Sequence, residues 1–227
     1  MMEKKKRINF IKKKINLNKE YNIQDAINIL KKNSITKFKE SLDVSINLGI
    51  DNKKKKQNIS GSVFLPYGKG KITKIAVFAN GLQAKYAKKA KADYIGMEDL
   101  AEKIIKKKII FDIIISSKET LPLVNKLNKI IGPKGLMPNL KFGTLTNNIY
   151  NAVKKFKFGQ IIYKNDKNGI IHSTIGKITL NTFYLKENLK TLLLKLKKEK
   201  PKEIKGIYIK KITLSTTMGI GLVIKKK

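Results

Sequence analysis

The middle of the chain alternates short apolar segments with amphipathic ones, and this alternation limits the fold more than any other feature. Beyond Lys71 the pattern predicts strands near 72–79, 94–95 and 109–115, and helices near 82–90, 98–107 and 120–128. Strands and helices in alternation are typical of βαβ units, which build a mainly parallel sheet. A last helix, capped by Thr146 and stopped by Gly159, closes the segment. The middle of the chain therefore predicts an α/β domain.

Longer strands precede this segment. Residues 42–50 alternate strictly between apolar and polar side chains, which predicts a strand with one buried face and one face for water or a partner. The buried face would carry Leu42, Val44, Ile46, Leu48 and Ile50, and the other face Asp43, Ser45 and Asn47. A short amphipathic helix comes before this strand, behind Asn22, which can cap its first turn, and a second strand follows near 62–65.

Long strands return beyond residue 159. Strands at 160–164 and 170–177 flank an Asn-Asp-Lys-Asn-Gly turn, whose Asn-Gly end predicts a hairpin with positive φ values. A leucine-rich helix over 185–196 and strands over 206–215 and 220–225 follow. Because both ends of the chain contain these longer strands, the sequence predicts a two-domain α/β protein. Residues 1–67 and 160–227 would form one α+β domain, interrupted by an inserted α/β domain at 68–159.

Glycine and proline mark the first domain boundary, where Pro66, Gly68 and Gly70 stand close together. The run Gly-Lys-Gly-Lys over 68–71 precedes a strand. A phosphate-binding loop instead needs strand, glycine loop and helix in that order, so the pattern favours a hinge.

A second cluster of glycine and proline lies at 132–139, which reads Gly-Pro-Lys-Gly-Leu-Met-Pro-Asn. Proline fixes its own φ and glycine permits positive φ, so this octapeptide predicts a rigid, shaped loop. We expect the loop to present Lys134 and Met137 at the surface of the insert.

The charge of the chain favours a polyanionic partner. Lys and Arg number 51 against 16 Asp and Glu, a formal net charge of +35, which favours nucleic acid ahead of an anionic membrane surface. The composition is also rich in Lys, Asn and Ile, as an A·T-biased genome would make it, so part of the charge can reflect mutational pressure. Arg7 is the only arginine, and without guanidinium forks the protein must rely on point charges, backbone donors and shape.

Several classes of protein are disfavoured by what the sequence lacks. There are no cysteines, a single histidine, and no nucleophile elbow, paired-histidine zinc motif or acidic metal cluster. We therefore expect no enzyme, cofactor or metal. The longest apolar stretch, 109–115, is too short to span a bilayer and the basic N-terminus has no signal-peptide core, which predicts a cytoplasmic protein without membrane contact.

Three local patterns suit RNA. Ser215, Thr216 and Thr217 lie before Met218 and Gly219, and hydroxyls with free amides can bind ribose and phosphate, although a hydrogen-bonded turn is the alternative. Lys37 and Phe38 place a cation beside a ring that could stack or belong to the core. His172 is equally compatible with a packed or edge position and with facing RNA.

Several long motifs together resemble one family. They are residues 132–139 followed by Lys-Phe-Gly-Thr at 141–144, the segments 163–176 and 209–219, and the shorter runs 47–51 and 96–100. With the length of the chain, these resemble the family of bacterial ribosomal protein L-one, from the side stalk of the large subunit. The resemblance implies a two-layer α+β sandwich, built from both termini, that binds 23S-type rRNA. It further implies an inserted Rossmann-like, three-layer α/β domain behind a two-segment hinge.

The resemblance also implies partners. It implies assistance in the release of deacylated tRNA from the exit site, repression of the protein's own messenger RNA, and no obligate homo-oligomer. The rRNA-binding positions that carry over are Lys37, Phe38, Glu40, Ser41, Lys164, Asp166, Lys167, His172, Ser215, Thr217, Met218 and Gly219. Secondary RNA contacts or hinge positions would be Pro66, Gly68, Gly70, Lys134, Met137 and Gly159. The family commonly has arginine where Lys134 stands and proline where Leu140 stands.

Two other functions remain as competing hypotheses. One is a nucleotide-using enzyme built on the insert at 68–159, and the other is a basic RNA chaperone whose charge acts without sequence preference.

Overall fold

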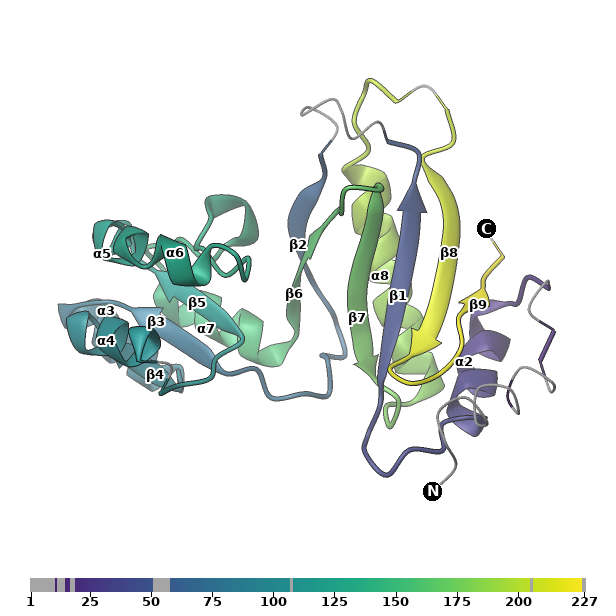
Figure 1. The fold of residues 1–227 in the computed structure, drawn as a ribbon, viewed down its shortest axis with the longest axis horizontal. Coiled ribbons are helices and arrows are strands. Elements are labelled where there is room, and N and C mark those ends of the chain that lie inside the picture. Colours follow the sequence, from purple (N-terminus) through teal and green to yellow (C-terminus); the bar gives the residue numbers. More distant parts are fainter. Residues whose placement is uncertain are drawn as a thin grey trace. The chain divides into compact units, whose positions relative to one another are not determined.

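The computed structural model describes residues 11, 15–16, 19–50, 58–106, 108–204 and 206–225. It is a mixed α/β protein (Figure 1). Contacts divide the chain into two compact units, Met1–Lys71 with Ile161–Lys227, and Ile72–Gln160. The basic N-terminus, Asp51 and Lys107 lie outside the described residues.

The first unit contains a four-stranded antiparallel sheet with the order β7-β1-β8-β9. Its strands are β1 (Ser41–Leu48), β7 (Ile170–Lys177), β8 (Ile209–Thr216) and β9 (Leu222–Val223). β1 pairs along its length with both β7 and β8, so a segment from the first part of the chain lies between two from the last (Figure 1). A separate two-stranded sheet joins β2 (Ser60–Phe64) to β6 (Gln160–Lys164).

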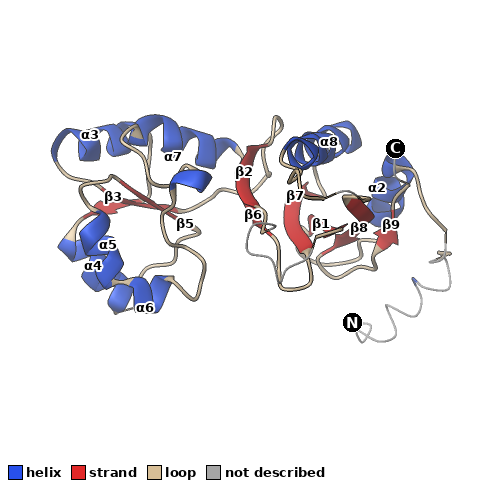
Figure 2. Ribbon diagram, turned by 90° about the horizontal axis from the view of Figure 1, so that it is seen from above, coloured by secondary structure: helices blue, strands red, loops and turns tan. Residues whose placement is uncertain are grey.

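Two helices contribute to the core of this unit, α2 (Ile23–Lys32) and α8 (Thr182–Lys198). α8 lies along one face of the sheet (Figure 2). The apolar residues of β1 alternate with partly exposed ones, as predicted, and pack in one core with the leucines of α8. Asn181 caps α8, because its Oδ1 accepts a hydrogen bond from Phe183 N at 3.0 Å. Asn22 occupies the corresponding position of α2, but its side chain makes no capping hydrogen bond.

The second unit contains a three-stranded parallel sheet with the order β4-β3-β5. Its strands are β3 (Ile75–Phe78), β4 (Tyr94–Gly96) and β5 (Ile113–Ser116). Figure 2 shows α3 (Gly81–Lys89) and α7 (Ile149–Phe158) on one side, and α4 (Glu98–Ile105), α5 (Leu121–Lys126) and α6 (Asn128–Ile131) on the other. Every residue of β3 and β5 is buried, as expected of parallel strands covered on both faces.

Some predicted boundaries in this unit are wrong. The strands predicted over 72–79 and 109–115 are shorter, and Ile72 and Ile110 are 80% and 78% exposed outside them, because apolar composition alone does not show where pairing ends. The last helix begins at Ile149 behind Asn148, whose Oδ1 accepts a hydrogen bond from Asn151 N. Thr146 is therefore not the cap, and its hydroxyl instead accepts a hydrogen bond from Asn148 N.

The predicted hairpin between β6 and β7 is also different. β6 pairs with β2 and β7 with β1, so the two strands belong to different sheets and share only the bridge between Asn165 and Ile171. Gly169 has a positive φ of 76°, but Asn168 does not. A tight turn links the two strands, and it serves as a corner between sheets.

Among the described residues, no helix combines the length and apolar character that crossing a membrane needs.

Candidate nucleic-acid interface

Polar side chains cover the face of the four-stranded sheet that lies opposite its core. Because directly paired residues of antiparallel strands point to the same face, the register defines its rows. Asp43 lies between Thr174 and Ser215, and in the next row Ser45 lies between His172 and Thr213. We call this surface the hydroxyl face, formed by Ser41, Asp43, Ser45, Asn47, Ile170, His172, Thr174, Lys177, Lys211, Thr213, Ser215 and Thr217.

Hydrogen bonds between strands order the side chains of the hydroxyl face. Thr174 Oγ1 donates to Asp43 Oδ1 at 2.7 Å, and Ser45 Oγ shares a hydrogen bond of 3.1 Å with His172 Nδ1. These contacts fix short side chains that can each still offer a donor or an acceptor to a partner. The face is thus preorganised for hydrogen bonding to ribose hydroxyls and phosphate oxygens. Because these side chains are shorter than lysine, a partner must approach the sheet closely.

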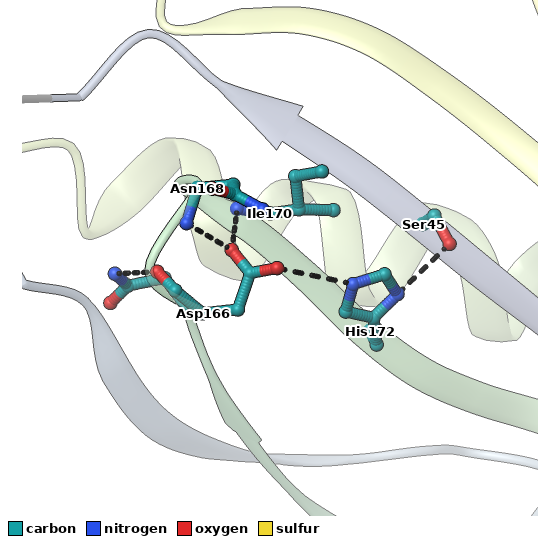
Figure 3. A network of polar contacts seen from close by, with 6 residues as sticks. Ser45, Asp166, Asn168, Ile170 and His172 are labelled. Atoms are coloured by element: carbon teal, nitrogen blue, oxygen red, sulfur yellow. Dashed lines mark hydrogen bonds and ion pairs between the residues drawn. The ribbon is translucent and has the colours of Figure 1, made fainter. Parts of the chain in front are cut away.

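His172 is held between two strands and a turn (Figure 3). Its Nε2 lies 3.6 Å from Asp166 Oδ2, while the other carboxylate oxygen of Asp166 accepts hydrogen bonds from Ile170 N at 2.8 Å and Asn168 N at 2.9 Å. The hydrogen bond from Ile170 N, with that from Asn168 N and the nearby His172, lowers the pKa of Asp166 below its ordinary value. The imidazole is 60% exposed, so this histidine lies at the surface of the sheet.

The other end of the hydroxyl face is closed by the turn after β8. Ser41 N donates to Thr217 Oγ1 at 3.0 Å, and Thr217 N donates to Ser41 O at 3.2 Å. Gly219 N donates to Thr216 O, and a Cβ on Gly219 would lie only 2.2 Å from Thr216 Oγ1. The turn therefore requires glycine at this position, and it places the partly exposed Met218 beside the start of β1.

The loop before β1 contributes a cation and an exposed ring. Lys37 is exposed and Phe38 is 53% exposed, which makes this phenylalanine a surface residue. Glu40 differs, because it is 2% exposed and accepts a hydrogen bond from Ser34 Oγ at 2.8 Å. Glu40 is thus placed to support the loop from inside, with little surface left for a partner.

Lys177 ties this loop to the end of β7. Its ammonium donates to Lys39 O at 2.9 Å and to Ser41 Oγ at 3.0 Å. The charge therefore stays at the rim of the hydroxyl face, where it can contact a phosphate without a large loss of side-chain entropy.

The other predicted site residues lie apart from the hydroxyl face. Lys164 and Lys167 are exposed near the Asp166 turn, Lys164 as the last residue of β6. Gly68 and Gly70 both have a φ of 66°, which favours glycine, and Pro66 is exposed beside them. Gly159, with a φ of 161°, has extended backbone that any residue adopts.

The octapeptide at 132–139 lies in the second unit, as turn and irregular structure. Lys134 is exposed, and Met137 is partly exposed while it also packs on the core of its unit. Gly135 has a positive φ of 68°. Gly132 is helical, and it is needed because a Cβ would lie 2.5 Å from Asn128 O.

Sequence reasoning missed much of the hydroxyl face. The alternation of 42–50 did indicate an outward row of Asp43, Ser45 and Asn47, but it left open whether that row meets water or a partner. Thr174, Lys177 and Thr213 join that row only through pairing across more than a hundred residues of sequence, for which one sequence offers no signal.

The arrangement suits binding. Within the described residues, no three His, Asp or Glu side chains gather as potential metal ligands. The hydroxyl face instead combines small donors and acceptors with lysines at its rim, in a chain with a net charge of +35.

Comparison with known families gives a match over most of the chain. A model of the ribosomal protein L1p/L10e family matches residues 30–220, which include the second unit, most of the first unit and every described strand except β9. The chain belongs to the ribosomal protein L1p/L10e family, whose members are non-enzymatic, RNA-binding constituents of the large subunit of the cytoplasmic ribosome.

Proposed function

We propose that the hydroxyl face, with the turn at 216–219 and the loop at 37–41, is the surface that binds the large-subunit rRNA of the side stalk. The observation that carries the proposal is the mutual hydrogen bonding of Ser41 and Thr217, which fixes an exposed turn of hydroxyl, methionine and glycine at the rim of an ordered polar sheet. RNA recognised by shape is contacted through 2′-hydroxyls and phosphates, and this surface offers short-range groups for both. Lysines add the salt-dependent part of the affinity.

The two units would then have different tasks. The discontinuous domain, predicted at 1–67 and 160–227, would hold the rRNA as a two-layer α+β sandwich. The insert at 68–159, a Rossmann-like three-layer α/β domain, would move about a hinge at Pro66, Gly68, Gly70 and Gly159. Two positive-φ glycines within three residues support the first hinge segment. Such movement would accompany the release of deacylated tRNA from the exit site, with Lys134 as a secondary RNA contact.

Repression of the protein's own messenger RNA would follow from the same surface. A face that reads backbone shape binds any RNA that folds like the stalk target, so a messenger with that fold would compete for it.

The experiment is a titration of the intact protein with the stalk rRNA fragment at physiological salt, beside a scrambled RNA of equal length. We expect Thr217→Val to weaken binding about tenfold, because Ser41 N loses its hydrogen-bond acceptor, and Met218→Asp to weaken it more, because a carboxylate meets phosphate. Thr191→Val on α8 and Ile110→Asp in the second unit are matched controls that introduce the same side chains elsewhere.

Equal binding of cognate and scrambled RNA would favour the unspecific chaperone. Binding by Thr217→Val and Met218→Asp that equals wild type would place the interface elsewhere.

A further inference from the structure

Three aromatic rings form an exposed cluster at the start of α8. Tyr67 stacks on Tyr184 with a centroid distance of 4.3 Å and an interplanar angle of 12°, and Phe183 packs edge-on against Tyr67 at 6.1 Å and against Tyr184 at 6.2 Å. The side chains are 39%, 40% and 54% exposed for Tyr67, Tyr184 and Phe183. We call these three residues the aromatic cluster.

The cluster is held in place by hydrogen bonds to its backbone. Asn188 is fully buried and binds two segments, since Oδ1 accepts from Tyr67 N at 3.2 Å and Nδ2 donates to Gly68 O at 3.0 Å and to Ile175 O at 3.1 Å. The capping hydrogen bond from Phe183 N to Asn181 fixes the helix end. The rings are therefore preorganised, which lowers the entropy lost when a partner binds.

The segment that carries Tyr67 adjoins the proposed RNA surface. Lys177 N donates to Lys69 O at 3.0 Å, and a Cβ on Gly70 would lie 3.2 Å from Lys177 Cβ. The ammonium of the same Lys177 reaches Lys39 and Ser41 at the rim of the hydroxyl face. One lysine thus connects the segment behind the aromatic cluster with the edge of the hydroxyl face.

The chemistry of the cluster fits a nucleobase. Every base has a π face, and stacking on Tyr or Phe tolerates any sequence, while cations nearby attract the phosphates on either side. Lys69 and Lys71 follow Tyr67 in the chain, and the protein as a whole has an excess of 35 positive charges. An acidic or neutral protein surface would be another occupant of an aromatic patch, but only RNA also explains its continuity with the hydroxyl face.

We propose that the aromatic cluster is a stacking platform for an unpaired base of the RNA strand that leaves the hydroxyl face at Lys177. This inference rests on the proposed function, because it extends the same RNA contact around the end of the sheet. It assigns a contact to Tyr67, Phe183 and Tyr184 that none of the motifs in the sequence indicated.

The test uses the intact protein and the stalk rRNA fragment with single-stranded extensions, in which 2-aminopurine replaces each unpaired base in turn. Stacking quenches the fluorescence of this base, so wild type should quench it at one position. Phe183→Leu should reduce the quenching there, and Phe183→Leu with Tyr184→Leu should abolish it and weaken binding about tenfold. Tyr86→Leu, which removes a 49% exposed ring from the second unit, should change neither.

The outcomes separate the two proposals. If wild type shows no preference for the stalk fragment, the proposed function fails. If wild type binds selectively but the double variant quenches and binds as wild type does, the rings serve another partner and only the stacking platform is wrong. The single Phe183→Leu variant gives the same answer should the double variant lose its folded circular dichroism spectrum.

Discussion

The two main sheets of this protein bury their residues in different ways. In β3 and β5 of the second unit every side chain is buried between two layers of helices, whereas β1 of the first unit buries alternate residues only. In β3 and β5 the parallel sheet has no face left for a partner. The antiparallel sheet keeps one, and its free positions are polar or charged except Ile170 and Val223, which pairs with Thr213 on the same face. The difference teaches that the sheet we propose as an interface is the one that helices cover on one side only.

The largest effect should come from placing the same charge on both sheets. We expect Val77→Asp in β3 to destabilise the second unit by several kcal/mol, on the order of 3–5, because a fully buried position offers no solvent for the carboxylate. Ser45→Asp on the hydroxyl face should leave the unfolding temperature nearly unchanged but weaken RNA binding at least about tenfold, through repulsion of phosphate. Thermal unfolding and RNA titration of both variants measure this difference.

Ser45→Ala serves as the control for Ser45→Asp, because it removes the hydroxyl without adding charge. A Ser45→Asp variant that unfolds as readily as Val77→Asp would show that the hydroxyl face is covered and that the comparison is wrong.

A smaller effect is expected on the covered side of the first unit, where two core tyrosines differ. The buried hydroxyl of Tyr208 has no hydrogen-bond partner among the described residues, whereas the Tyr163 hydroxyl donates to Glu199. Tyr208→Phe should therefore stabilise the unit by about 1 kcal/mol and Tyr163→Phe should destabilise it by a similar amount. Urea unfolding of the two variants gives the sign of each change in the free energy of unfolding. Changes of the same sign would contradict this interpretation of the core.

Tyr208 should also make the stability of the protein depend on pH in the alkaline range. Burial, with a contribution from Glu199, raises the pKa of Tyr208 to about 12 from an ordinary value of 10.0. Because the pKa is raised in the folded state, the contribution of neutral Tyr208 to the free energy of unfolding is fully present below pH 10. This contribution is lost as the pH rises from 10 toward 12. The loss should be shallower in Tyr208→Phe when unfolding is followed against pH.

The smallest effect concerns the turn beside the hydroxyl face. The pKa of Asp166 is lowered by hydrogen bonds to its carboxylate, chiefly from Ile170 N, so its stabilisation of the turn is present at neutral pH. That stabilisation disappears as the pH falls through the lowered pKa, below the ordinary value of 3.8. The protection factor of the Ile170 amide, which is its exchange rate relative to the intrinsic rate at each pH, should fall on acidification in wild type but not in Asp166→Asn, while global stability stays the same.

Local signals in the sequence predicted most of the elements. The strict alternation at 42–50 matched β1, and the leucines behind Asn181 matched α8, because both patterns follow directly from the geometry of a strand and a helix. The hairpin at 165–169 was wrong because turn residues specify a tight turn but not which strands pair on either side of it. Pairing depends on distant segments, and no local propensity encodes it.

The candidate site was predicted only in part, because its assembly also depends on pairing between distant segments. Ser41, His172, Ser215 and Thr217 were expected to bind RNA through resemblance, and pairing does bring them to one face of one sheet. Burial separates Glu40 from that face, and no pattern in the sequence distinguishes a buried glutamate behind a loop from an exposed one. Asn188 was likewise missed, because two of its three partners, Tyr67 and Gly68, lie about 120 residues away in the chain.

The central place of β1 has a consequence for the synthesis of the protein. β1 pairs with β7 and β8, and β7 begins at Ile170, so its partners do not exist when β1 leaves the exit tunnel. At 5–20 residues per second the chain needs roughly ten seconds to extend that far. The parallel sheet at 75–116 is complete earlier, so the insert can fold first during translation. Until β7 and β8 emerge, β1 and its apolar face remain unpaired at the surface of the ribosome that makes the protein.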